Sequence, residues 1–290
     1  MDISIVIVNY NTKILIKQCL QSVLKKTKDI NYEIIVVDNA SYDGLQAMLK
    51  KEFPQVKLIE SSENLGFGKA NNLGAKYASG KYLLLLNPDT ILLNNAVKIL
   101  FDFMEKNPNC GICGGNLYDE NNNPVHSFGR LLGIGKELRA FFSLPATIEF
   151  NTTEKAQKVG YITGADLMIN RRLFNNIGYF DEEFFMYYED VELTYRVKRE
   201  GFDVYSIPQS KIMHLEGKSS NNKQKKQWDL TSKKLYYQKT HSKFYVEIAN
   251  AIFALTILSR CIVYKLLGNK GKFELWQYQF QYFKHNTEFK

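Results

Sequence analysis

Three short runs of the sequence are apolar at almost every position. They span residues 3–8, 34–37 and 82–86 and consist mainly of isoleucine, valine and leucine. A strand requires such a run when both of its faces are buried, as in the middle of a parallel sheet that is covered by helices. The sequence therefore predicts strands that are buried on both faces.

Segments with helical periodicity separate these runs. Apolar residues recur at intervals of three and four over residues 16–24, 45–53 and 70–78, and Pro54 closes the second of these segments. A further short strand is predicted at residues 56–59. The resulting order of strands and helices alternates strictly along the chain, which predicts an α/β fold with a parallel, doubly wound sheet.

The predicted strands end in polar residues. Asn9 ends the first strand, Asp38 the second, and Asn87 and Asp89 follow the run at residues 82–86. In such sheets a ligand binds in the crevice beyond the carboxyl ends of the strands. Any exposed loop also needs polar residues, so the prediction of a ligand site rests on three such strand ends sharing one edge.

Two common phosphate-binding motifs are missing from the sequence. No Gly-x-Gly-x-x-Gly follows the first strand, and no Gly-x-x-x-x-Gly-Lys-Ser/Thr occurs anywhere, so dinucleotide-binding and P-loop interpretations lose their main support. Residues 64–68 read Asn-Leu-Gly-Phe-Gly before the third helix. Such a segment either lets the backbone approach a ligand or makes a tight turn.

The second half of the chain carries fewer regular signals. Residues 111–150 are predicted to form loops with short strands, and further strands are predicted at residues 160–170, 202–207 and 212–215. Asp166 lies among the apolar residues of the first of these strands. A carboxylate in such a place is costly unless it is paired or used.

The segment at residues 180–193 combines five aromatic residues with a dense set of acids that includes Glu189 and Asp190. The acids are either the first turn of a helix, where they complement the helix dipole, or a catalytic carboxylate beside an aromatic-lined sugar pocket. A single histidine follows at His214, and a lone histidine is usually structural.

Taken together, these segments resemble the family 2 glycosyltransferases of the GT-A fold, and especially bacterial rhamnosyltransferase-type enzymes of O-antigen and polysaccharide assembly. The likeness covers roughly residues 1–218 and rests on ISIVIVNYN, VVDNASYDG, NLGFGKANNLG, YLLLLNPDT, GADLMINRRLFNNIGYFDEEFFMYYEDVELTYRVKREG and MHLEGKS, in the family's order. Each piece alone is a frequent chance match, whereas the set is highly specific. The resemblance implies a Rossmann-like, mostly parallel sheet flanked by helices, and an inverting transfer from a nucleotide-diphosphate sugar to an acceptor hydroxyl.

The resemblance also implies how the donor is bound. Asp38 matches the aspartate that hydrogen-bonds the base or the ribose of the nucleotide. Asn9 lies at the strand end that contacts the nucleotide, and Gly66 and Asn71 belong to the matching segment that is assigned to donor binding. Rhamnose from dTDP-rhamnose is the first choice of donor, while UDP-galactose, UDP-glucose and UDP-N-acetylhexosamine remain open.

A divalent metal, Mg²⁺ or Mn²⁺, is implied by the match of Asp89 to the last acid of the family's Asp-x-Asp motif. Here that motif reads Asn87-Pro88-Asp89, so a neutral amide replaces one acid. Mg²⁺ in such sites takes one or two carboxylates plus the phosphates of the substrate, so one aspartate is sufficient. His214 matches a histidine that completes the metal or phosphate site.

The catalytic assignment comes from the Glu-Asp motif of the family. Asp190 matches its second acid, the general base that takes the proton from the acceptor hydroxyl. Glu189 is adjacent, and the sequence does not separate the two. Asp166 matches a position near the transferred sugar and the acceptor, so it is assigned to positioning, together with Glu189.

Residues 219–290 lie outside the strong match and are predicted to form a basic, aromatic-rich helical region. Nine lysines fall between residues 211 and 243. The apolar stretch at residues 244–267 contains Glu247 and Arg260, which are costly in a spanning helix. We expect an amphipathic helix in the membrane interface. The alternative is a helix that packs on the catalytic domain.

The predicted surroundings of the enzyme follow from these features. The chain begins without the pattern of a signal peptide. We expect a cytoplasmic enzyme that associates peripherally with the anionic inner face of the cell membrane, and a lipid-linked or polysaccharide glycan as acceptor. The aromatic residues of 276–283 suit either interface anchoring or contact within a homodimer.

The sequence leaves three rival interpretations. Nucleotidyltransferases of this fold present a glycine-rich, basic loop after the first strand, but residues 9–12 read Asn-Tyr-Asn-Thr. A nucleic-acid partner is not expected, because no zinc-finger, RNA-recognition or homeodomain signature occurs. A non-catalytic scaffold is disfavoured by the intact Asp38, Asp89 and Asp190, although the missing first acid of the motif supports it.

Overall fold

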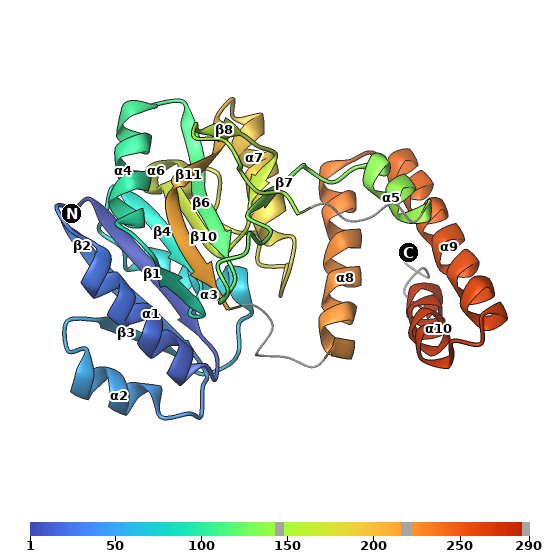
Figure 1. Cartoon of the computed structure of the whole chain (residues 1–290), viewed down its shortest axis with the longest axis horizontal. Coiled ribbons are helices and arrows are strands. Elements are labelled where there is room, and N and C mark those ends of the chain that lie inside the picture. The colour runs from blue at the N-terminus through green and yellow to red at the C-terminus, as the bar shows by residue number, and fades with distance from the viewer. Residues whose placement is uncertain (143–147, 216–221, 286–290) are drawn as a thin grey trace. The chain divides into compact units, whose positions relative to one another are not determined.

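The computed structural model describes residues 1–142, 148–215 and 222–285, and the chain divides into two compact units (Figure 1). The first unit comprises Met1–Leu131 and Ile148–Lys233, and the second comprises Leu132–Thr147 and Lys234–Lys290. The division at residue 218 into a catalytic and a C-terminal domain stays a prediction.

The first half of the first unit alternates between strands and helices, as predicted. Its elements are β1 (Ile3–Asn9), α1 (Lys13–Lys26), β2 (Tyr32–Asn39), α2 (Leu45–Glu52), β3 (Lys57–Ser61), α3 (Phe67–Lys76) and β4 (Tyr82–Leu86). The pairs β1–β2, β1–β4 and β2–β3 are all parallel. The predicted parallel core of the sheet is therefore confirmed.

The second half completes a mixed sheet. Its elements are β5 (Thr90–Leu92), α4 (Ala96–Lys106), β6 (Cys110–Tyr118), β7 (Phe128–Gly129), β8 (Gln157–Lys158), β9 (Tyr161–Ile162), β10 (Asp166–Asn170), α6 (Arg171–Asn176), α7 (Glu189–Arg199) and β11 (Asp203–His214). The main strand order is β3-β2-β1-β4-β10-β6-β11-β5. The strand β10 runs antiparallel to β4 and β6, whereas β11 runs parallel to β6.

Three predictions for this half were wrong in detail. The strands expected at residues 202–207 and 212–215 are one strand, β11, with a shift in its pairing to β6 between Ile207 and Lys211. Pro208 lies in that irregular segment, and proline lacks the N–H that a regular ladder needs. The strand expected at residues 160–170 is divided into β9 and β10, and the loops expected at 111–150 contain the nine-residue strand β6.

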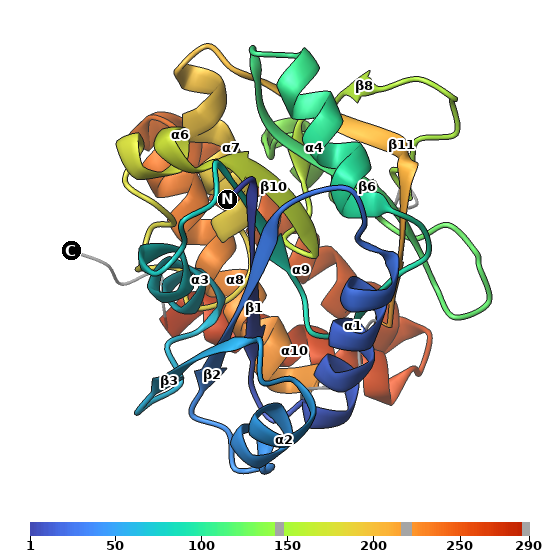
Figure 2. The same ribbon diagram turned by 90° about the vertical axis from the view of Figure 1, so that its left-hand side faces the viewer.

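The core lies on both faces of the sheet, because successive side chains of a strand point in opposite directions. On one face Ile5, Ile7 and Leu84 belong to a cluster that includes residues of α1, α2 and α4. On the other face Val6 and Leu85 belong to a cluster that includes residues of α3, α6 and α7. In Figure 2, α1 and α4 lie on one side of the sheet and α3 and α7 on the other. Full burial of each such side chain contributes about 1.5–3 kcal/mol.

The register of the sheet brings polar residues to one edge. Asn9 lies opposite Asp38 at the carboxyl ends of β1 and β2. Because β10 is antiparallel to β4, its first residue Asp166 lies opposite Leu86, the last residue of β4. The pairing of β11 with β5 places His214 opposite Thr90 in the same way. The antiparallel pairings thus add Asp166 and His214, from the second half of the chain, to the edge of the sheet that carries Asn9 and Asp38.

The second unit is helical, as predicted. It contains α5 (Ile134–Phe141), the last residues of α8 (Asn222–Thr240), α9 (Lys243–Leu266) and α10 (Lys270–His285). The hydroxyl of Tyr245 on α9 accepts a hydrogen bond from the Ile134 N–H at 2.7 Å, and the Tyr237 hydroxyl donates to Glu137 at 3.1 Å. These bonds tie α5, which comes from between β7 and β8, to the C-terminal helices.

Candidate functional site

The loops after β1 and β2 are joined through Ser41. Asn9 is fully buried, and its amide group donates to the Ser41 hydroxyl at 3.0 Å while its oxygen accepts from the Thr12 hydroxyl at 2.7 Å. One oxygen of Asp38 accepts from the Ser41 N–H at 3.0 Å, and the other accepts from the side chain of Gln46. The two predicted donor-binding residues therefore lie side by side with fixed orientations.

The glycine-containing segment before α3 is held by Asn39. The Asn39 side chain accepts from the Leu65 N–H at 2.8 Å and donates to the Gly66 carbonyl at 3.2 Å. Gly66 has a φ of 79°, and a Cβ there would overlap the backbone carbonyl of Phe185. Glycine is required at this position because of both the left-handed conformation and the close approach of a second loop.

Asn71, the fourth residue assigned to donor binding, lies on α3. Its side chain is buried, with 2% exposed, and it donates to the Phe67 carbonyl at 3.0 Å within the same helix. The structure thus places Asn71 against the backbone of Phe67, the residue that follows Gly66. Asn39 was not singled out from the sequence, because an asparagine at the end of a strand carries no local sign of which loop it will hold.

Asp89 and His214 come together at the ends of β4 and β11. The Nε2 atom of His214 lies 3.3 Å from the Oδ1 atom of Asp89 and 3.5 Å from the Nδ2 atom of Asn87. The Leu215 N–H donates to the backbone carbonyl of Asp89 at 2.9 Å, which fixes the two strand ends together. The structure therefore assembles the two residues that were assigned to the metal.

This pair suits a divalent cation. A carboxylate oxygen and an imidazole nitrogen are both metal ligands, and two neighbouring ligands of an octahedral ion lie about 3 Å apart. Within residues 1–142, 148–215 and 222–285, no group of three histidine, cysteine, aspartate or glutamate side chains is placed to hold a metal. An ion bound by Asp89 and His214 would need further oxygen ligands from outside this pair.

Asp166 is fully buried beside this pair. One carboxyl oxygen accepts from the Gly115 N–H at 2.5 Å, and the other has no hydrogen-bond partner among the residues that the structure describes. Burial raises the pKa of Asp166 to about 8, although the Gly115 hydrogen bond and the nearby His214 act in the opposite direction. The side chain is therefore mostly a neutral acid at pH 7 and is able to donate a hydrogen bond.

The two acids that begin α7 have different surroundings. Glu189 has 5% of its surface exposed, and burial together with the charge of Asp190 raises the pKa of Glu189 well above its usual value. Asp190 is half-buried, and its two carboxyl oxygens accept from the Gly164 N–H at 2.9 Å and from the Val191 N–H at 2.8 Å. Asp190 is thus the oriented and more accessible acid of the pair.

Two neighbours of Asp190 were not found by sequence reasoning. Gly164 supplies the backbone N–H described above, and Tyr161 lies close enough that burial and the charge of Asp190 raise the pKa of its phenol. The Tyr161 hydroxyl lies 3.2 Å from the Nε2 atom of His126. Gly164 begins one of the matching motifs, but the motif does not indicate that its N–H contacts Asp190. No pattern marks Tyr161, which approaches α7 through the position of β9.

The segment before α7 has an unusual backbone. Tyr187 and Tyr188 have φ values of 69° and 66°, in the left-handed region that bulky residues rarely occupy. Each such residue costs about 1–3 kcal/mol and persists only where surrounding contacts impose it. These two residues directly precede Glu189 and Asp190, so the strain is located at the candidate site.

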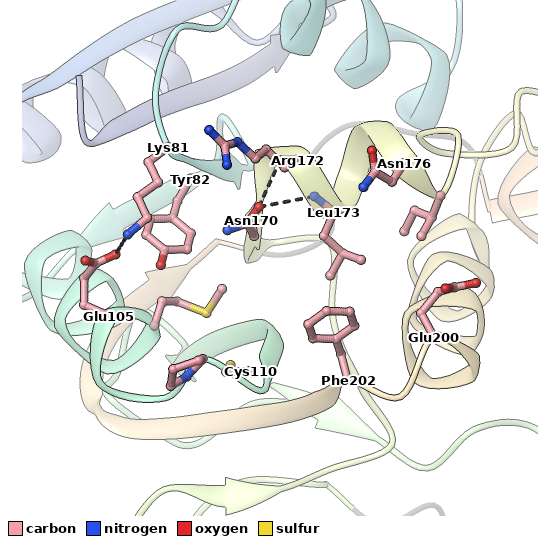
Figure 3. Close-up of a pocket in the computed structure, with 13 residues that line it drawn as sticks. Lys81, Tyr82, Glu105, Cys110, Asn170, Arg172, Leu173, Asn176, Glu200 and Phe202 are labelled. Carbon is pink, nitrogen blue, oxygen red and sulfur yellow. Dashed lines mark hydrogen bonds and ion pairs between the residues drawn. The ribbon is translucent and has the colours of Figure 1, made fainter.

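A cavity of about 510 Å³ lies at the other end of the sheet (Figure 3). It is lined by residues that include Tyr82, where β4 begins, and Asn170, where the antiparallel β10 ends. Three of its polar side chains have structural partners, because Lys81 pairs with Glu105 at 2.5 Å and Asn170 caps α6. The cavity contains none of the predicted site residues, so we place the candidate site at the opposite, carboxyl edge.

A comparison with protein families decides the family of this chain. The model for "Glycosyl transferase family 2" matches residues 4–178, which is more than half of the sequence. The chain belongs to glycosyltransferase family 2. The matched segment includes the strand ends that carry Asn9, Asp38 and Asp89, and it also includes Asp166.

Two curated relatives of this family 2 glycosyltransferase have named activities. The low-salt glycan biosynthesis hexosyltransferase Agl10 of Haloferax volcanii is 28% identical over 207 residues, which cover 70% of this chain and 64% of the relative. The N-acetylglucosaminyl-diphospho-decaprenol L-rhamnosyltransferase of Mycobacterium tuberculosis is 26% identical over 207 residues, covering 64% and 67%. The matched regions thus cover about two thirds of each relative's length.

A solved structure confirms the fold. The mannosyltransferase PcManGT of Pyrobaculum calidifontis, in complex with GDP-Man and Mn²⁺, has a TM-score of 0.61 to this chain at 13% identity. The likeness covers 97% of this chain and 84% of that one. The predicted GT-A fold of a family 2 glycosyltransferase is therefore confirmed.

We expect the stability of the protein to depend on the ionisation of Asp166. In the folded protein the Asp166 carboxyl group keeps its proton up to a pH of about 8, whereas in the unfolded chain it releases the proton near pH 3.8. The folded state thus binds more protons across this window, and the free energy of unfolding falls with rising pH by up to about 1.4 kcal/mol per pH unit from this group. The loss is complete once the pH has passed the folded pKa.

The variant Asp166→Asn imitates the neutral acid and removes this dependence. In urea unfolding at pH 5, 6, 7 and 8, we expect the variant to gain stability relative to the wild type as the pH rises. A difference between the two proteins that stays constant with pH would contradict the raised pKa.

Proposed function

We propose that this chain is an inverting glycosyltransferase that moves a sugar from a nucleotide-diphosphate donor to an acceptor hydroxyl. The observation that carries this proposal is the geometry of Asp190. Two backbone N–H groups orient its carboxylate, and it is only half-buried next to the buried Glu189. This is the arrangement that a general base needs, in a chain of a family of sugar-transferring enzymes.

In the proposed reaction Asp190 takes the proton from the acceptor hydroxyl. The acceptor oxygen attacks the anomeric carbon from the face opposite the leaving diphosphate, so the configuration at that carbon inverts. Burial of Glu189 and the charge of Asp190 raise the pKa of Glu189 well above its usual value, which favours the neutral form of Glu189 beside the base. Asp166, whose pKa burial raises to about 8, positions the sugar or the acceptor by donating a hydrogen bond.

The donor nucleotide is proposed to bind along the edge formed by β1 and β2. Asp38 and Asn9 are oriented there through Ser41, and Asp38 accepts hydrogen bonds from the base or the ribose. The segment with Gly66, supported by Asn71, forms the neighbouring wall. Asp89 and His214 would hold Mg²⁺ or Mn²⁺, which when bound neutralises negative charge on the diphosphate.

The donor sugar is proposed to be rhamnose, supplied as dTDP-rhamnose. The support is the resemblance of the motifs and the L-rhamnosyltransferase among the relatives. The alternative is transfer of galactose, glucose or N-acetylhexosamine from a UDP donor, since another relative is named a hexosyltransferase and the solved neighbour is a mannosyltransferase. The panel of donors described below separates these possibilities.

The acceptor is proposed to be a lipid-linked or polysaccharide glycan at the cytoplasmic face of the membrane. The name of the mycobacterial relative gives its acceptor as N-acetylglucosaminyl-diphospho-decaprenol. In the second unit, α9 is long and apolar enough to cross a membrane by length and composition, and only 17% of its most apolar window is buried. Glu247 and Arg260 lie within it, so we propose that α9 lies in the membrane interface.

The turn between α9 and α10 supports this membrane proposal. Leu266 and Leu267 are 82% and 71% exposed, and the exposed Lys265, Lys270 and Lys272 surround them in the sequence. Exposed leucines beside lysines are complementary to a bilayer with anionic headgroups, because the apolar chains enter the interface while the charges stay at its surface.

The first prediction of this proposal concerns donor binding and turnover. In a panel of dTDP-rhamnose and common UDP- and GDP-sugars, we expect one donor to raise the melting temperature and to be hydrolysed or transferred. Asp38→Ala is expected to abolish the thermal shift. Asp190→Asn is expected to keep it and to lose turnover by at least about 100-fold, the contribution of a general base.

Asp102→Asn is the matched control, because it makes the same change in a surface ion pair with Lys98 on α4. It should behave as the wild type does. If no nucleotide sugar binds under any metal condition, the proposed function is wrong, and a scaffold or a nucleic-acid-binding role should be tested instead.

The second prediction concerns the metal. Asp89→Asn and His214→Ala each remove one proposed ligand, so we expect Mn²⁺ to increase donor affinity in the wild type but much less in either variant. Isothermal titration with the matching nucleoside diphosphate, in Mn²⁺ or EDTA, measures this without turnover. Equal affinity of the wild type in Mn²⁺ and EDTA would show that no metal takes part in binding.

The third prediction concerns the membrane. We expect the protein to sediment with vesicles that contain phosphatidylglycerol, to be released by high salt, and to bind neutral vesicles weakly. The double variant Leu266→Glu/Leu267→Glu should weaken this binding by at least about tenfold. Ile14→Glu, at an isoleucine of α1 that is 73% exposed, is the matched control. Resistance to alkaline carbonate would instead indicate that α9 spans the bilayer.

A further inference from the structure

The strained segment before α7 is held by the first half of α8. The aromatic ring of Phe185 packs against Trp228 with 5.1 Å between ring centroids. The Ser232 hydroxyl donates to the Met186 carbonyl at 2.8 Å, and the Tyr188 hydroxyl donates to Asp229 at 3.0 Å. Three successive contacts therefore join residues 185–188 to α8.

The three α8 residues lie on one side of the helix. Trp228, Asp229 and Ser232 are related by spacings of one, three and four, and residues at the latter two spacings lie on the same helix face. Asp229 is itself fixed, because Lys226 forms an ion pair with it at 3.0 Å. The face thus presents an aromatic ring, an oriented carboxylate and a hydroxyl to the segment.

The other side of the segment is held by the donor-binding loop. The Phe67 N–H at the start of α3 donates to the Phe185 carbonyl at 2.9 Å, directly beside Gly66. Residues 185–188 are therefore clamped between the start of α3 and α8. This clamp explains how two consecutive tyrosines remain in the left-handed region, since strained conformations persist only where contacts over-determine them.

The backbone of Tyr188 determines where α7 begins. Tyr188 is the residue before the first turn, and its carbonyl accepts from the Glu192 N–H at 2.9 Å. If Tyr188 relaxed to an ordinary backbone conformation, the first turn of α7 would rotate. The Asp190 carboxylate would then lose its alignment with the Gly164 N–H, which belongs to a different part of the chain.

We propose that the hydrogen bond between Tyr188 and Asp229 is a latch that positions the catalytic base. Tyr188 and Asp229 are positioning residues, because they act on Asp190 only through the backbone. This inference rests on the proposed role of Asp190. It adds α8, which lies outside the matched region of the family, to the machinery of the reaction.

The latch predicts a loss of turnover without a loss of donor binding. In Tyr188→Phe the ring stays and only the hydroxyl is removed, so we expect kcat to fall by about tenfold, since misplacement by a fraction of an ångström is costly. The affinity for the donor and the melting temperature should change little. Asp229→Ala should lower kcat at least as much as Tyr188→Phe, since it also removes the ion pair with Lys226. The double variant should be no worse than Asp229→Ala, because both changes break the same Tyr188–Asp229 hydrogen bond.

Conservative variants separate the latch from a purely structural role. Asp229→Asn keeps an acceptor oxygen for the Tyr188 hydroxyl and should restore most of kcat. Lys226→Met removes the ion pair but leaves the latch and should reduce kcat less than Asp229→Ala does. Tyr77→Phe is the matched control, because Tyr77 is an exposed tyrosine at the end of α3. Additive losses, or a fall in melting temperature that accounts for the lost activity, would overturn the latch.

A measurement that needs no substrate completes the test. We expect amide hydrogen exchange over residues 186–192 to accelerate in Tyr188→Phe and Asp229→Ala, with unchanged exchange in β1 and β4. Inactivity of the wild type with every donor would reject the proposed function, whereas an active wild type with an equally active Tyr188→Phe would reject the latch alone. Unchanged exchange in both variants would also reject the latch.

Discussion

The central strands β1, β2 and β4 are buried on both faces, and this constraint decides where a ligand has access. Helices cover each face of the sheet, so a polar group that is to meet a ligand must lie at a strand end. Asn9 and Asp38 occupy adjacent ends and are oriented by one serine, Ser41. Asp166, Asp190 and His214, from the second half of the chain, are then added around this edge.

Reversal of strand direction brings the chemically distinct groups together. The antiparallel β10 begins with Asp166 beside the end of β4, and the pairing of β11 with β5 brings His214 to Asp89. Burial then differentiates the acids. It raises the pKa of Asp166 and of Glu189, so Asp190, which two backbone N–H groups orient, remains as the accessible acid of α7.

The position of Asp190 also depends on residues that do not belong to the sheet. Residues 185–188 lie between the start of α3 and α8, and two left-handed tyrosines lead directly into the first turn of α7. The segment that contains Gly66 and the segment that leads into α7 are thereby connected through the Phe67 N–H and the Phe185 carbonyl. The strained backbone of this segment is held by contacts on both of its sides.

The sequence by itself determined the alternation of strands and helices, the polar strand ends, the family and the helical nature of the C-terminal region. These follow from apolar periodicity and short motifs, which are properties of neighbouring residues. Only the tertiary structure decided that Pro208 lies within one strand, that α5 joins the C-terminal helices, and how Glu189 differs from Asp190. The reason is that burial, strand reversal and the left-handed conformation of Tyr187 and Tyr188 arise from contacts between segments far apart in the chain, which no local pattern encodes.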